Sequence, residues 1–126
     1  MKLITAVALA LALTGCSTVT AWLPSFWDSN QSNYIVQIQA DIDSIQCSLP
    51  QQPQVAVVDR GLRVFMLYSV AKGAAQHDVI AVVEPLQITV SAWLARGEGS
   101  ESYCRIKQAL LAKGAARASQ VVMGRW

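Results

Sequence analysis

The side chains best suited to chemistry are the three cysteines and the single histidine of the chain: Cys16, Cys47, Cys104 and His77. A thiol can act as a nucleophile, bind a metal or form a disulfide, and an imidazole can act as a general base or a metal ligand. No two cysteines have the close spacing of a redox-active pair or a zinc knuckle. We therefore expect no metal site, no cofactor and no catalytic centre built on histidine.

The histidine and the acidic residues do not form a recognisable catalytic group. His77 lies in a polar Ala-Gln-His-Asp segment without a Ser or Cys nucleophile in a recognisable turn nearby, so we interpret it as a solvated loop residue. Asp41 and Asp43 are two positions apart and would lie on different faces of a helix. Glu84 stands in an apolar run and is expected to face solvent. The sequence predicts no catalytic residues.

The first sixteen residues have the sequence pattern of an export signal. A positive Met1-Lys2 is followed by an apolar stretch from Leu3 to Leu13, which is too short to span a bilayer, and then by Leu13-Thr14-Gly15-Cys16. This pattern resembles the signal peptide of bacterial lipoproteins, which is cut before the cysteine of a Leu-x-Gly-Cys lipobox. The resemblance implies a cleaved signal peptide over 1–15 and acylation of Cys16.

The resemblance also implies a location. In many Gram-negative lipoproteins an Asp directly after the acylated cysteine retains the protein in the inner membrane, and this chain has Ser17 there. The expected location is the periplasmic face of the outer membrane, with membrane lipid as the partner of acylated Cys16. Several acyl chains on one residue are sufficient for stable anchoring.

The segment 16–33 is rich in Ser, Thr and Asn and shows no sustained hydrophobic period, so it is predicted to be a flexible tether. Tryptophan favours the membrane interface, which makes Trp22 and Trp27 candidates for contact with lipid headgroups. In the alternative interpretation, Phe26 or Trp27 packs on the following domain.

The remainder, 34–126, is predicted to be a helical domain. Its first segment is ambiguous, because the residues 36–43 alternate between apolar and polar, as in a half-buried strand. A second pattern has helical spacing and comprises Ile35, Ile38, Ile42, Ile45 and Leu49. The periodic region is long for a strand and ordinary for a helix, which favours a helix ending near Leu49.

Three further helices are predicted at about 54–72, 79–94 and 101–122. The first of them is apolar nearly all round and is expected to be central. In the second, the residues 86–94 can also be interpreted as a strand, and Pro85 is expected to kink the helix or to start a new one. Helices of this length with short connections predict an all-α, up-down four-helix bundle.

The last predicted helix carries small side chains on one stripe. Two sets of residues repeat every seven positions: Cys104, Leu111 and Ala118, and Gln108, Ala115 and Val122. Small side chains allow a neighbouring helix to approach closely, so we interpret this stripe as an internal seam. A surface for a partner is the alternative.

A disulfide between Cys47 and Cys104 is expected, because an exported protein meets an oxidising environment. In an up-down bundle the first helix ends where the fourth begins, which brings these two residues to the same end. A regular helix would point Cys47 away from the isoleucine stripe, so we expect it in a fraying last turn.

The composition and net charge of the chain argue against some classes of function. The chain has 126 residues and a net charge of +2, with 53% hydrophobic and 14% charged residues, and this near-neutral balance gives no electrostatic case for nucleic-acid binding. Bases are concentrated from Arg60 onward, which indicates either a dipole between packed helices or a basic face for anionic lipid or a partner.

The expected function is non-catalytic binding or scaffolding, with an unidentified envelope protein as the partner. The lipobox, the segments 24–27 and 103–104 and the end 124–126 are together similar to small helical lipoproteins encoded by phages. That similarity implies a spanin-type lysis subunit or a superinfection-excluding lipoprotein. A periplasmic enzyme inhibitor or immunity protein is the alternative from another class.

Overall fold

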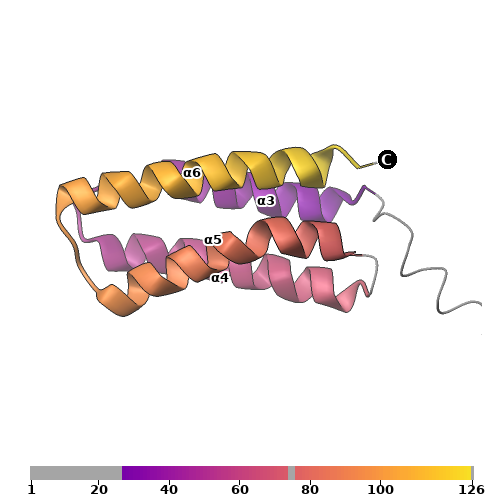
Figure 1. Cartoon of the computed structure of the whole chain (residues 1–126), viewed down its shortest axis with the longest axis horizontal. Helices are drawn as coiled ribbons and strands as arrows, with labels where there is room; N and C mark the ends of the chain where they lie inside the picture. The colour runs from indigo at the N-terminus through magenta and orange to yellow at the C-terminus, as the bar shows by residue number, and fades with distance from the viewer. Residues whose placement is uncertain (1–26, 74–75, 126) are drawn as a thin grey trace, which may run out of the picture.

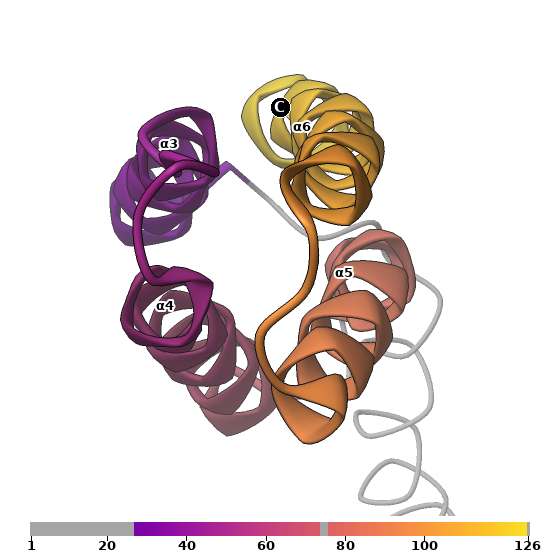
Figure 2. The same cartoon turned by 90° about the vertical axis from the view of Figure 1, so that its left-hand side faces the viewer.

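Four helices make up the domain in a computed structural model that describes residues 27–73 and 76–125. They are α3 (Ser29–Asp43), α4 (Gln51–Ala71), α5 (His77–Arg96) and α6 (Glu101–Met123). The helices run up and down alongside one another (Figure 1), and seen from one end they form a ring in chain order (Figure 2). No strand occurs in the described residues. The predicted all-α four-helix bundle is confirmed.

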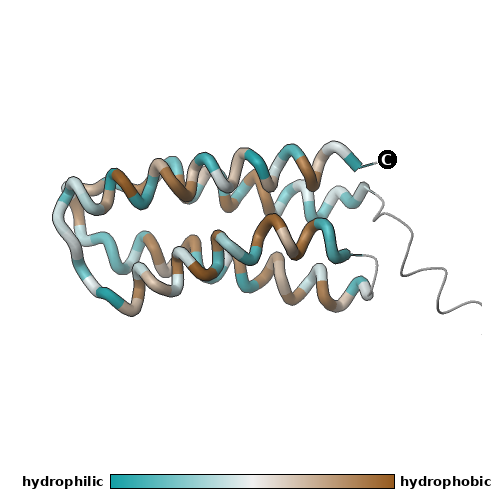
Figure 3. The backbone as a smooth tube through the Cα atoms, in the orientation of Figure 1, coloured by the Kyte–Doolittle hydropathy of each residue, from teal (hydrophilic) through white to brown (hydrophobic). Residues whose placement is uncertain are grey.

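Each helix turns one apolar stripe towards the centre. The buried stripe of α3 is Ile35, Ile38 and Ile42, whereas Val36 is 50% exposed, which rules out the alternating strand pattern in this segment. Apolar residues recur along all four helices (Figure 3). The stripes of α4 and α5 are those predicted: Val55, Val58, Leu62 and Phe65, and Val79, Val83, Leu86, Val90 and Trp93.

The bounds of α3 differ from the prediction at both ends. Asp28 caps the helix, which begins at Ser29, so the predicted tether is wrong for the residues 29–33. At the other end the helix stops at Asp43, and the remaining residues up to Pro50 form the connection to α4. The predicted signal peptide and Cys16 lie outside the described residues.

Glycine and serine residues mark three of the helix ends. Gly73 and Gly97 follow α4 and α5 with φ of +104° and +89°, a region that favours glycine. Ser100 caps α6 by accepting a hydrogen bond from the N–H of Tyr103 at 3.1 Å. Pro85 lies inside a continuous α5, so it starts no new helix.

The prediction that α4 is central is wrong. Each helix contacts its two neighbours in the ring, and α4 has an outward face on which Leu67 is 71% and Val70 62% exposed. Hydrophobicity alone does not distinguish the stripe that a helix buries from one that it leaves in solvent.

The small residues of α6 do form an internal seam. Ala115 and Ala118 are fully buried, together with Leu111 and Val122. A Cβ atom added at Gly114 would lie 2.6 Å from a methyl carbon of Leu86, so α5 and α6 approach closely here. The seam interpretation is therefore confirmed.

Candidate functional site

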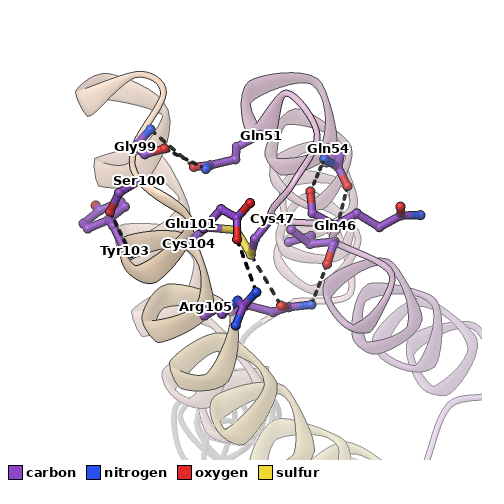
Figure 4. Close-up of a disulfide and its surroundings, with 12 residues drawn as sticks. Gln46, Cys47, Gln51, Gln54, Gly99, Ser100, Glu101, Tyr103, Cys104 and Arg105 are labelled. Carbon is purple, nitrogen blue, oxygen red and sulfur yellow. Dashed lines mark hydrogen bonds and ion pairs between the residues drawn. A yellow bond between two sulfur atoms is a disulfide. The ribbon is translucent and has the colours of Figure 1, made fainter.

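A disulfide closes the end of the bundle at which the α3–α4 and α5–α6 connections meet. Cys47 and Cys104 are bonded, with their Cα atoms 5.6 Å apart (Figure 4). Cys47 lies in the connection after α3 and not in the fraying helical turn that was predicted. Its side chain is therefore not held in the direction that a regular helix would give it, away from the isoleucine stripe. Cys104 is fully buried in the first turn of α6.

Glutamine side chains support the same end. The amide of Gln108 on α6 donates hydrogen bonds to the carbonyl groups of Ile42 and Ile45, at 2.9 and 3.0 Å. The amide of the buried Gln51 donates to the carbonyl group of Gly99 at 2.9 Å. These bonds satisfy carbonyl groups at the end of α3 and in the two connections, which have no partner within a helix.

Glu98 caps α4 from the connection between α5 and α6. The helix is preceded by Pro50 and has no side-chain cap of its own. The carboxylate of Glu98 accepts hydrogen bonds from the backbone N–H groups of Gln51 and Gln52, at 2.9 and 3.0 Å. The bonds from Gln52 and Gln51 hold the pKa of Glu98 below its ordinary value. This capping role was not predicted from the sequence, because Glu98 and the start of α4 are far apart in the chain.

We expect Glu98→Gln to lower the melting temperature at neutral pH, because a neutral amide is a weaker acceptor at the positive end of a helix. The folded pKa of Glu98 lies below its unfolded value of 4.5, so its stabilisation is present above that pH and declines as pH falls. The difference between variant and wild type should therefore shrink in thermal melts below about pH 4. The exposed Glu84→Gln is the matched control. Equal melting temperatures for both variants at pH 7 would contradict the capping role.

The opposite end holds the start of α3 against the end of α4. The carboxylate of Asp28 accepts hydrogen bonds from the N–H groups of Asn30 and Gln31, at 2.8 and 3.0 Å, and forms an ion pair with Lys72. The hydroxyl of Tyr68 donates to it at 3.2 Å. Burial raises the pKa of Asp28, but its bonds to Lys72, Gln31 and Tyr68 outweigh burial and lower the pKa to about 2.

A buried polar network lies beside Asp28. The amide of Gln31, which is fully buried, donates to the hydroxyl of Ser69 at 2.9 Å and to the side-chain oxygen of Gln76 at 2.8 Å. Its oxygen accepts a bond from the guanidinium of Arg125 at 2.6 Å. Burial lowers the pKa of Arg125, and the charge of Asp78 opposes that shift. The network joins α3 and α4 to the residue before α5 and to a residue just after α6.

The remaining predicted site residues are exposed or outside the described residues. Trp27 is 53% exposed, while Cys16 and Trp22 are not described. His77 is exposed at the start of α5, and so is Glu84 further along the same helix. Within 27–73 and 76–125, no group of three or more His, Cys, Asp or Glu side chains could hold a metal ion.

One helix of the described residues, α5, is long and apolar enough to cross a membrane by length and composition. Its buried stripe, which includes Val83, Val90 and Trp93, packs in the bundle core. Core helices of bundles share this composition. Comparisons with protein-family models, curated proteins and solved structures found no match to this chain.

Proposed function

We propose that this protein is a bacterial lipoprotein, held by acyl chains on Cys16 at the periplasmic face of the outer membrane, and that it acts by binding or scaffolding. The observation that carries the proposal is the Leu13-Thr14-Gly15-Cys16 motif directly after an apolar stretch. Ser17 supports the outer membrane over the inner one.

Two features of the fold support an anchored domain outside the cytoplasm. A structural disulfide suits an oxidising compartment. The chain enters the bundle at Asp28, whose bonds to Tyr68 and Lys72 fix the first helix to the second at the point where a tether would pull. Fully extended, the residues 17–27 would span at most about 40 Å between the lipid and the bundle.

Replacement of Cys16 tests whether the protein is anchored by acyl chains. We expect Cys16→Ala to abolish acylation completely, because the thiol accepts the first acyl chain and the residue defines the cleavage site. The measurement is incorporation of a radioactive fatty acid in cells, together with the membrane and soluble fractions. Wild-type protein and the Ser17→Ala variant are the controls, and both should be labelled. Label persisting in Cys16→Ala would refute the lipoprotein assignment.

The location is tested separately. Ser17→Asp should move the labelled protein from the outer-membrane to the inner-membrane fraction. Wild-type protein found wholly in the inner membrane would contradict the proposed location but not the acylation.

A further inference from the structure

The outward face of α4 carries a second heptad pattern, which we call the outer seam: Val57, Arg60, Val64, Leu67 and Ala71. Their spacing of three and four residues is that of positions a and d in a coiled coil. Val57 is 49%, Val64 41% and Leu67 71% exposed. The helix therefore presents one seam to its own bundle and a similar seam to solvent.

A shallow apolar groove runs beside the outer seam, between α4 and α3. Its walls include Tyr34, Val57 and Val64, and α3 and α4 approach closely at Gly61, where an added Cβ would lie 3.1 Å from a side-chain carbon of Ile38. Figure 2 shows α3 and α4 side by side along one flank of the ring.

The groove also contains one acid and one base. Asp41 of α3 and Arg60 of α4 both line it. Among the described residues Arg60 forms no ion pair, and Asp41 accepts a hydrogen bond from the amide of Gln37 at 2.8 Å. A ligand for this flank should therefore bring apolar residues at helical spacing, with an acid to meet Arg60 and a base to meet Asp41.

We propose that a second copy of this chain covers the groove, in a parallel dimer about a two-fold axis along the helices. Rotation about that axis places α4 of each copy opposite α3 of the other at the same height. Arg60 then faces Asp41 of the second copy, and the reverse contact follows by symmetry. Val57 and Val64 of the two copies meet near the axis.

The parallel direction rests on the proposed function. If both chains are anchored through residues that precede Asp28, both bundles present the same end to one membrane. An antiparallel pair would point the two Asp28 ends in opposite directions. It would also set α4 opposite α4 of the second copy, so Arg60 would no longer face Asp41.

Cysteine crosslinking tests the arrangement. Val57→Cys and Val64→Cys are made singly in the full chain, which is oxidised mildly in membranes and analysed by non-reducing electrophoresis. A parallel pair should give a crosslinked dimer at both positions, because each residue meets its own copy. Ile106→Cys on α6, at a residue 68% exposed, is the control and should stay monomeric. Crosslinking at only one position would indicate an antiparallel pair. The absence of a crosslink at both positions would refute the parallel dimer.

Other occupants of the groove give a different result. If the tether or the lipid surface covers it, the thiols at 57 and 64 should resist both crosslinking and labelling by a soluble maleimide. That result would overturn the proposal. The lipoprotein assignment can fail independently, because Val64→Cys should still dimerise in a Cys16→Ala background that carries no acyl label.

Charge reversal tests the ionic contact. Arg60→Asp should reduce the crosslinking yield of Val64→Cys by about tenfold or more, because it sets an acid against Asp41 of the second copy. Adding Asp41→Arg should restore the yield. Arg117→Asp, an exposed base on α6, should leave it unchanged. Failure of the double reversal to restore a lost yield would refute the proposed pairing of these residues.

Discussion

A chain carrying Cys47→Ser and Cys104→Ser should unfold at a much lower temperature than the wild type while keeping its helical content. The disulfide spans 57 residues, and the chain-entropy model gives a stabilisation of roughly 4 kcal/mol for a loop of that length. In a domain of this size that corresponds to a fall in melting temperature of roughly 15–30 °C. The native helices should persist because the apolar core does not depend on the bond.

Circular dichroism measures both parts of this prediction, through the melting curve and the helical signal of the folded state. Wild-type protein treated with a reductant should melt like the double variant, which separates loss of the bond from effects of the serines. Two thiols that react with an alkylating agent in the denatured, unreduced wild type would contradict the bond itself. An unchanged melting temperature would contradict its stabilising role.

The fold was predictable because the buried stripes have the helical period along most of their length. Ile38 and Ile42 belong to both the alternating strand pattern and the helical stripe, and only the length of the segment favoured the helix. The disulfide followed from topology, since an up-down bundle brings the end of α3 and the start of α6 together. These inferences depend on local pattern and on connection length, which a single sequence contains.

The bounds of α3 could have been predicted more closely. Asp28 followed by Gln31 has the spacing of a capping box, which marks a helix start. The polar composition of the segment obscured that signal. The same Gln31 is fully buried among Ser69, Gln76 and Arg125, and no local pattern links residues so distant in the sequence.

The two apolar stripes of α4 show a different limit. Val55, Val58 and Leu62 face the core, and Val57 and Val64 face outward, yet both sets have heptad spacing. Which stripe a helix buries depends on where its neighbours lie, and the sequence of the helix alone does not determine that. The cap that Glu98 provides for α4 is equally non-local.

A leucine at position 115 should destabilise the isolated bundle. Ala115 is fully buried on α6, in the stripe of small residues that faces the core. The added side chain must displace its neighbours, at a cost of about 1–3 kcal/mol. Urea unfolding measures the loss. Ala109→Leu makes the same change at an exposed position of the same helix and should leave the free energy of unfolding within about 0.5 kcal/mol of the wild type.

The same variant distinguishes an internal seam from a working surface. Because Ala115 faces the core, Ala115→Leu should lower stability without changing the crosslinking of Val64→Cys at temperatures where the bundle stays folded. An unchanged free energy of unfolding together with lost crosslinks would mean that this stripe of α6 contacts a partner. Partner binding would then have to be reassigned from the outer seam of α4 to α6, on the far side of the ring (Figure 2).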